Sequence, residues 1–182
     1  MSDRLAAIAE RIDRMVAAIG RAVMWLALFV VLGEFAVVLL RYIFGIGSLW
    51  LAESVIYAHA ALFLLAAGWT QQANGHVRVD VFYGEASPRA RARVDLFGAL
   101  LLLLPFVAVI GWFSLPYVAR SWAVLEGSRE ASGLPFVYLL KSLIPLFAVL
   151  LGLAGVAQAI RAALVLRSLP FSTNGSPGQT GQ

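Results

Sequence analysis

The sequence contains no cysteine among its 182 residues. This excludes disulfides, thiolate metal sites, iron–sulfur clusters, c-type haem attachment and a cysteine nucleophile. Charged residues are also scarce, at 13% of the chain, whereas soluble domains carry about a quarter. Hydrophobic residues reach 61%, well above the roughly one half of ordinary soluble domains. This composition is typical of a membrane protein.

Histidine is nearly absent too, since His59 and His76 are the only two. His59 alone lies in an apolar run, so two histidines from different spans of one chain cannot hold a haem. One side of a segment that is expected to be extended carries His76, Arg78 and Asp80. A metal site there would lack a second nitrogen ligand. The glycines form no phosphate loop, and no serine, histidine and aspartate follow a hydrolase order. The sequence therefore predicts no metal, no cofactor and no enzyme.

Four apolar runs are long enough to cross a bilayer, which takes ~20 helical residues for a ~30 Å hydrocarbon core. We expect spans at residues 22–44, 50–69, 94–118 and 134–166. The predicted fold is therefore an all-α membrane protein with four transmembrane helices in one domain, residues 22–167. The remaining residues, 168–182, are rich in serine, glycine, proline, asparagine and glutamine, which predicts a disordered tail.

Prolines and glycines add local expectations. Ser87 followed by Pro88 is typical of a helix start, with a capping hydroxyl before proline at the first helical position. Pro105 inside the third run predicts a kink, and Pro116 predicts the end of that helix. The glycines that permit close helix contacts in lipid are Gly68, Gly152 and Gly155.

Residues 1–21 precede the first span and mix apolar and charged positions at helical spacing. The apolar stripe consists of Leu5, Ile8, Ile12, Met15, Val16 and Ile19. The polar side consists of Arg4, Glu10, Arg11, Asp13 and Arg14. Such an N-terminal amphipathic helix either lies in the headgroup plane or extends the first span, and periodicity alone does not separate these two arrangements.

Basic residues predict the orientation of the spans, because cytoplasmic segments carry an excess of lysine and arginine. Ten of the 14 basic residues fall on one side: Arg4, Arg11, Arg14, Arg21, Arg78, Arg89, Arg91, Arg93, Arg161 and Arg167. The other side holds Arg41, Arg120, Arg129 and Lys141. Both termini are therefore expected in the cytoplasm. This topology and contacts with lipid headgroups account for the net charge of +4, so no nucleic-acid partner is predicted.

Two polar residues fall in the middle of apolar runs, Glu34 in the first and His59 in the second. At about 1.5 Å per residue, both are expected ~13–15 Å below the outer surface. A charged residue at mid-bilayer costs roughly 2.5–3.5 kcal/mol, so it usually faces protein. Because consecutive antiparallel spans are usually neighbours, we expect Glu34 and His59 to face each other or a shared partner. The pattern leaves three interpretations open: a satisfied helix contact, a proton or substrate relay, and a contact with another subunit.

A short turn at residues 45–48 joins the first two spans. Arg41 and Glu53 are placed to form an ion pair across it, either as a weak interfacial contact or as a corner that docks a partner. Trp50 suits interfacial anchoring. In the fourth span, Lys141 is expected to extend its ammonium group to the membrane surface.

Several short motifs follow one another in a specific order. They are Arg41-Tyr42-Ile43-Phe44, Ser48 with Trp50 and Glu53, His76-Val77-Arg78-Val79-Asp80, Ser87-Pro88-Arg89, Glu126-Gly127-Ser128, Gly133-Leu134-Pro135, and Lys141 with Ile144-Pro145-Leu146. Together they resemble the small membrane subunit of tripartite ATP-independent periplasmic (TRAP) transporters, the DctQ-like family, over about residues 20–167. Members of this family often carry a small or amide residue at the position of Glu34.

The resemblance implies a four-helix protein of the bacterial inner membrane that binds a much larger, DctM-like membrane subunit carrying the substrate and sodium sites. A DctP-like periplasmic protein would deliver the substrate, commonly an organic acid. The small subunit would act as a scaffold among membrane lipids, without a substrate site of its own. The candidates for structural or partner-interface roles are Glu34, Arg41, Tyr42, Trp50, Glu53, His59, His76, Arg78, Asp80 and Lys141.

Two other classes of protein fit part of the pattern. A stand-alone four-helix, proton-coupled exporter would use Glu34 as its single membrane carboxylate. Such exporters lack the long N-terminal segment, the basic middle connection and the outer loop of this chain. A haem-bearing membrane anchor of a respiratory enzyme is the second alternative, and an absorption spectrum of the purified protein tests it.

Overall fold

The computed structural model describes residues 2–75 and 83–168, and these form helices without a strand. The elements are α1 (Ser2–Val23), α2 (Leu26–Ile43), α3 (Leu49–Gln72), α5 (Pro88–Phe97), the π-helical segment η1 (Gly98–Leu103), α6 (Leu104–Ala123) and α7 (Val137–Ser168). Four helical stretches are long and apolar enough to cross a membrane: Ser2–Ile43, Leu49–Gln72, Pro88–Ala123 and Val137–Ser168. The prediction of an all-α fold with four helices capable of spanning a membrane is confirmed.

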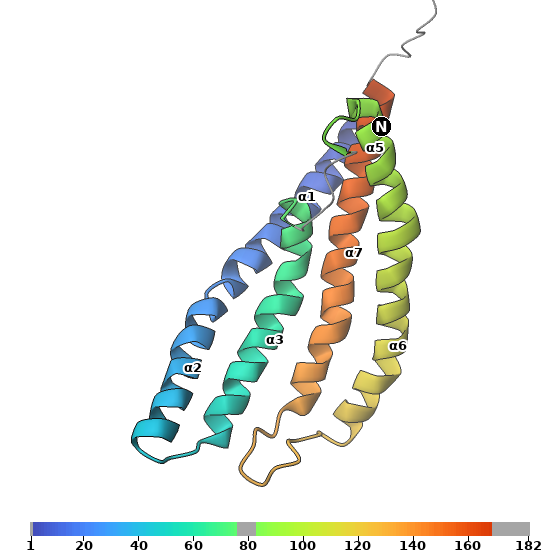
Figure 1. The fold of residues 1–182 in the computed structure, drawn as a ribbon. Helices are drawn as coiled ribbons and strands as arrows, with labels where there is room; N and C mark the ends of the chain where they lie inside the picture. Colours follow the sequence, from blue (N-terminus) through green and yellow to red (C-terminus); the bar gives the residue numbers. More distant parts are fainter. Residues whose placement is uncertain (1, 76–82, 169–182) are drawn as a thin grey trace, which may run out of the picture.

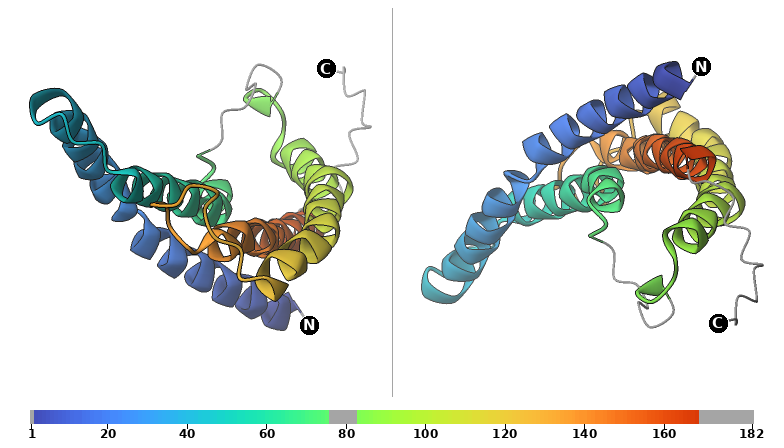
Figure 2. Two further views of the ribbon diagram at one scale, coloured as in Figure 1. Left: turned by 90° about the horizontal axis from the view of Figure 1, so that it is seen from below. Right: turned by 90° about the horizontal axis from the view of Figure 1, so that it is seen from above.

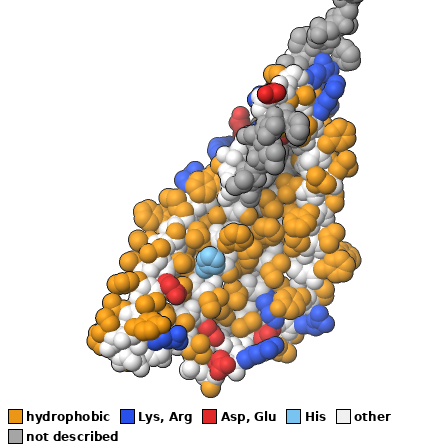
Figure 3. Space-filling view, in the orientation of Figure 1, with side chains coloured by type: hydrophobic (Ala, Val, Ile, Leu, Met, Phe, Trp, Pro, Cys, Tyr) orange, Lys and Arg blue, Asp and Glu red, His pale blue; other side chains and the backbone are white. Residues whose placement is uncertain are grey.

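The two ends of the molecule are formed by different structural elements. The end that holds the start of α1 and the end of α7 is named the inner end (Figure 1). The opposite end, with the α2–α3 turn and residues 124–136, is named the outer end, and residues 124–136 are named the outer loop. Charged side chains gather at both ends, and hydrophobic side chains cover the face between them (Figure 3). The predicted extended segment with His76, Arg78 and Asp80, and the predicted disordered tail, lie outside the described residues.

The helices form a curved row instead of a closed bundle. Seen along their axes, α2, α3, α7 and α6 follow one another in an arc, and α1 crosses one side of α3 and α7 (Figure 2). Each helix of the arc packs on its neighbours, and α1 packs on α3 and α7 as well. One broad face of the arc therefore stays open, whereas α1 covers part of the other (Figure 2). The buried hydrophobic cluster is correspondingly thin and lies between α6 and α7, around Val107, Ala148 and Leu151.

α1 and α2 are separate helices, joined by a break at residues 24–25. α1 packs across α3 and α7, with Val16 only 1% exposed. Gly20 lies so close to α3 that a Cβ at this position would be 2.6 Å from the Trp69 side chain. The expected N-terminal amphipathic helix is therefore present, and it covers two other helices of the same chain.

Asp13 lies toward α7 and not on the polar side of α1, where the helical pattern placed it. α1 turns its small residues Ala9 and Gly20 inward, because small residues permit close contact. The same rotation brings Asp13 to Arg161 of α7 and leaves Met15 exposed, although the predicted apolar stripe included it. The predicted assignment of Asp13 to the polar side of α1 was thus wrong, because the close approach of the helices decided which side of α1 faces inward.

The α2–α3 hairpin depends on its turn and on one close contact. Gly45 adopts a φ of 65°, a left-handed conformation that glycine takes without strain. Ser48 caps α3 by accepting a hydrogen bond from the N–H of Leu51 at 3.3 Å. Further from the turn, Gly33 packs closely on α3. A Cβ at Gly33 would be 2.7 Å from the Val55 side chain. This contact sets the register of the two helices.

The third span begins where the sequence predicted a helix start. The hydroxyl of Ser87 caps α5 by accepting a hydrogen bond from the N–H of Ala90 at 3.2 Å. α5 passes into the π-helical η1, which ends two residues before Pro105. A proline lacks the N–H that an α-helix would use at this point, and the backbone next to it is π-helical. The predicted kink at Pro105 itself stays a prediction.

Pro116 does not end the third span, because α6 continues to Ala123. The prediction of an end near Pro116 was wrong. A proline removes one backbone hydrogen bond, but the residues beyond it are packed: Val118 and Ser121 are buried. These contacts keep the last turns of α6 helical.

Close helix contacts at glycines were predicted correctly. A Cβ at Gly68 of α3 would lie 2.8 Å from the backbone oxygen of Leu150 in α7. A Cβ at Gly155 of α7 would lie 2.8 Å from the Leu103 side chain. Glycine thus permits α7 to approach both of its neighbours in the row.

Candidate functional site

The outer loop is held on α3 by Glu53. One carboxylate oxygen of Glu53 accepts a hydrogen bond from the hydroxyl of Ser128 at 2.6 Å, and the other accepts one from the N–H of Leu134 at 2.5 Å. Only glycine leaves room for this contact at position 133, because a Cβ there would lie 2.7 Å from the same carboxylate. Arg41 is exposed and makes no ion pair with Glu53 within the described residues. The predicted pairing of these two residues is therefore not formed, since both oxygens of Glu53 are engaged by the outer loop.

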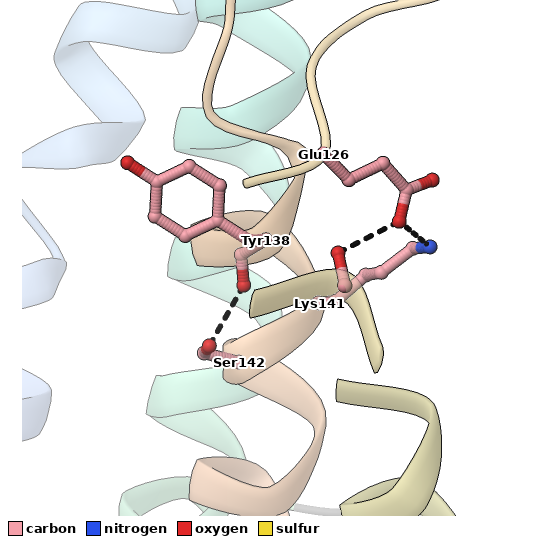
Figure 4. A network of polar contacts seen from close by, with 5 residues as sticks. Glu126, Tyr138, Lys141 and Ser142 are labelled. Carbon is pink, nitrogen blue, oxygen red and sulfur yellow. Dashed lines mark hydrogen bonds and ion pairs between the residues drawn. The ribbon is translucent and has the colours of Figure 1, made fainter. Parts of the chain in front are cut away.

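A second polar cluster joins α6, the outer loop and α7 (Figure 4). Glu126 accepts hydrogen bonds from Lys141 at 2.5 Å and from the hydroxyl of Ser121 at 2.7 Å. The ammonium group of Lys141 also lies 4.2 Å from the ring centroid of Tyr117. The hydrogen bonds from Lys141 and Ser121 hold the pKa of Glu126 below its ordinary value. Lys141 does reach toward the outer surface, but it ends on protein, with a side chain only 16% exposed.

An aromatic contact also joins α6 to α7 at the outer end. The indole N–H of Trp122 donates to the hydroxyl of Ser142 at 2.8 Å, and that hydroxyl donates to the carbonyl of Tyr138 at 2.7 Å. The rings of Trp122 and Tyr138 meet edge to face with their centroids 4.7 Å apart. The start of α7 is thus attached to the end of α6 by both polar and aromatic contacts.

Glu34 and His59 do not form a pair. Both side chains are exposed, and neither has a hydrogen-bond partner among the residues that the structure describes. Gly33 lies opposite Val55, so His59, four residues further along α3, lies about 6 Å further from the turn than the level of Gly33. Glu34 lies one residue nearer the turn than Gly33, so the two polar residues are at different depths. His59 instead stacks on Phe63, with 6.4 Å between ring centroids. The expected mutual contact and equal depth are therefore not found, because the Gly33 contact decides both the register and the outward direction of these side chains. Contact of both residues with a shared partner stays a prediction.

The corner formed by the α2–α3 turn is the most exposed part of the outer end. Tyr42 is 81% exposed and Trp50 is 58% exposed. Arg41, which precedes Tyr42 in the chain, is exposed as well. The corner thus presents two amphipathic aromatic side chains and one free positive charge, a combination typical of membrane interfaces and of protein contacts.

Sequence reasoning missed two polar contacts at the inner end. Asp13 of α1 forms an ion pair with Arg161 of α7. The amide of Gln71 in α3 donates to the amide oxygen of Gln158 in α7 at 2.7 Å. Gln158 and Arg161 are three positions apart in an otherwise apolar stretch of α7, residues 143–166, which places them on one face. That spacing was the available signal for this contact.

These features define a multi-pass helical membrane protein whose described ionisable residues, apart from Glu34 and His59, lie toward the two ends of its spans. A family model described as tripartite ATP-independent periplasmic transporters, DctQ component, matches residues 30–165. The match covers three quarters of the chain, so the chain belongs to the DctQ family, the small membrane component of TRAP transporters. No curated protein and no solved structure matches the chain.

Proposed function

We propose that this chain is the scaffold subunit of a TRAP transporter of the bacterial inner membrane. It supports a large, DctM-like permease subunit during ion-coupled uptake of an organic acid, which a DctP-like periplasmic protein delivers. Membership of the DctQ family supports this role, because the family operates in tripartite systems with a large membrane subunit and a binding protein. In this proposal both termini lie in the cytoplasm, in agreement with the excess of arginine in α1 and α5.

The single observation that carries the proposal is the open row of helices. Large hydrophobic side chains of α2 are exposed, among them Leu28, Val31 and Phe35. A transporter that bound its own substrate between helices would need walls on two sides of a polar path, whereas a row offers one wall. A row also exposes far more apolar surface than a closed bundle of the same length, and another membrane subunit has room to pack on it.

We further propose that the exposed polar residues of α2 and α3 mark the side that meets the large subunit. Glu34 and His59 lie within the apolar part of their helices and face outward. An ionised carboxylate facing lipid at this depth costs roughly 2.5–3.5 kcal/mol. A basic or hydrogen-bond-donating side chain of the large subunit opposite Glu34 would remove that cost. The exposed corner with Arg41, Tyr42 and Trp50 belongs to the same hairpin and extends this contact to the outer surface.

Co-purification tests the scaffold role. The tagged chain is co-expressed with a large TRAP membrane subunit and solubilised, and the expected result is a stable complex at fixed stoichiometry. Glu34→Gln keeps a hydrogen-bonding group and is expected to retain most of the complex. Glu34→Lys places a like charge against a basic partner and is expected to lose it. Glu130→Gln, in the exposed part of the outer loop, is the control and leaves the complex intact.

Transport by the chain alone would contradict the proposal. Proteoliposomes that contain only this chain are expected to move no solute under a proton or sodium gradient. Loss of an intrinsic export activity on Glu34→Gln would instead assign the chain to the single-carboxylate exporters.

A further inference from the structure

Two hollows at the inner end share a rim. A polar hollow of about 570 Å³ lies between α1, α3, α5 and α7, and an apolar groove of about 630 Å³ runs along α5, η1 and the start of α6. Gln71, Asp95 and Gln158 line both of them. The two hollows are therefore continuous, with a polar part at the charged inner end and an apolar part toward the middle of the membrane.

The polar hollow carries charges of both signs in equal number. Its charged lining consists of Asp13, Asp95, Arg91 and Arg161, whose formal charges cancel. A site that selects an anion has an excess of basic residues, and a site that selects a cation has an excess of acidic ones. The lining thus fits a headgroup that is itself neutral but contains both charges.

Two residues that line the polar hollow also carry buried acceptor atoms without donors. Oδ1 of Asp13 and Oε1 of Gln72 are buried, and neither has a hydrogen-bond donor among the residues described. A buried acceptor without a partner is unfavourable, so these oxygens favour a ligand that brings N–H groups. Arg161 donates to Asp13 from one nitrogen, and its side chain stays 41% exposed. A guanidinium carries five N–H groups, so Arg161 retains donors for an anionic group such as a phosphate.

The apolar groove has the length of one leaflet. Its lining runs from Val94 to Phe106, about 18 Å along the helix, while half of the ~30 Å hydrocarbon core is about 15 Å. Leu101 and Leu102, both in the lining, are largely exposed. The groove is open at Gly98, where an added Cβ would meet no atom within 4 Å. An acyl chain of one leaflet would cover these surfaces.

We propose that the polar hollow and the apolar groove together bind one phospholipid of the phosphatidylethanolamine class. Its primary ammonium donates hydrogen bonds to Asp95 and to the free oxygens of Asp13 and Gln72. Its phosphate accepts hydrogen bonds from Arg161, and one acyl chain fills the groove. Phosphatidylcholine has no N–H on its headgroup and leaves the acceptor oxygens unsatisfied. Phosphatidylglycerol can donate hydrogen bonds from its hydroxyls, but it brings a net negative charge and no cation to the carboxylates of Asp13 and Asp95.

Native mass spectrometry of the purified full-length chain tests headgroup selection. The protein is delipidated and mixed with phosphatidylethanolamine, phosphatidylcholine or phosphatidylglycerol of identical acyl chains. The expected result is one retained phosphatidylethanolamine per chain, at severalfold higher occupancy than the other two lipids. Equal occupancy for all three lipids would overturn the proposal.

Two variants separate the headgroup contact from the groove. Gly98→Leu places a side chain in the open groove, where its Cβ meets no atom within 4 Å, and is expected to remove the bound lipid. Gly47→Leu, at a second glycine with open space around it, is the matched control and keeps the lipid. Asp95→Asn preserves an acceptor for the hydroxyl of Tyr83, which donates to Asp95 at 2.8 Å, but it is expected to reduce the preference for phosphatidylethanolamine over phosphatidylcholine to near one.

Two outcomes would contradict the site itself. A folded Gly98→Leu protein with unchanged lipid occupancy would show that the groove is not used. Displacement of the lipid when the large subunit binds would show that the groove is a protein contact. The lipid assay needs no partner subunit, so it can fail while the scaffold role stands, and the reverse also holds.

Discussion

The carboxylate of Glu53 in α3 accepts a hydrogen bond from the backbone N–H of Leu134, 81 positions further along the chain. The same side chain accepts a second hydrogen bond from Ser128. The outer loop has no helix or strand of its own in residues 124–136, so side-chain contacts determine where it lies. Glu53 attaches it to α3, while Glu126 attaches it to α6 and α7. This relationship makes Glu53 the most informative single position at the outer end.

Glu53→Gln is expected to loosen the outer loop. The carboxylate accepts both hydrogen bonds with its negative charge, whereas an amide has one acceptor oxygen and no charge. The N–H of Leu134 and the hydroxyl of Ser128 can then not both donate to an acceptor oxygen, and the remaining bond is a weaker, neutral one. Trypsin cleavage after Arg129 is expected to become severalfold faster, and the melting temperature in detergent is expected to fall by several degrees. Glu85→Gln changes an exposed carboxyl far from the cleavage site and should leave both values unchanged. Unaltered cleavage in Glu53→Gln would argue against the role given to this residue.

The effect of a glycine-to-alanine substitution on stability should depend on the atoms that the new methyl group meets. At Gly68 it meets the backbone of α7 at 2.8 Å, which cannot move without shifting the helix. At Gly155 it meets the flexible side chain of Leu103 at the same distance. At Gly98 it meets nothing. Overpacking costs about 1–3 kcal/mol, whereas alanine gains about 1 kcal/mol over glycine in a helix.

Stability measured by denaturation in mixed micelles is therefore expected to fall most for Gly68→Ala and less for Gly155→Ala. Gly98→Ala is expected to be neutral or stabilising. A reversed order would mean that the α3–α7 contact is looser than described.

The ion pair between Asp13 and Arg161 should couple α1 to α7. A double-mutant cycle with Asp13→Asn, Arg161→Gln and the double variant is expected to give a coupling free energy of about 1 kcal/mol, because both side chains are partly exposed. Either single variant should also speed hydrogen–deuterium exchange in α1 more than in α3. If exchange in α1 stayed at the wild-type rate, its packing alone would hold it in place.

The hydrogen bonds on Glu126 predict a stability change in acid. Because its folded pKa lies below the ordinary value of 4.5, the folded state binds this proton less readily than the unfolded state does. The contribution to the free energy of unfolding is complete above pH 4.5 and is lost as the pH falls through the lowered pKa. Melting temperatures recorded from about pH 7 down to about pH 3 should show a smaller acid loss in Glu126→Gln than in the wild type. Glu130→Gln should keep the wild-type profile, and equal profiles for both variants would contradict this role of Glu126.

Much of the helix pattern followed from local sequence. Apolar runs of membrane-crossing length produced four spans, and Ser87 with Pro88 began α5 where expected. Pro116 failed as a stop signal because packing beyond it compensates for one lost hydrogen bond. The expected ion pair of Arg41 with Glu53 failed for a related reason: the alternative donors, Ser128 and Leu134, come from a distant loop.

The sequence alone determined that the chain is helical, that it spans a membrane, and that it belongs with the DctQ family, because run length, composition and motif order are properties of neighbouring residues. The tertiary structure decided that the helices form an open row, that Glu34 and His59 face outward, and that Asp13 faces inward. These outcomes depend on which helix surfaces approach most closely. In lipid that choice is made by the positions of glycine and other small residues across several helices at once.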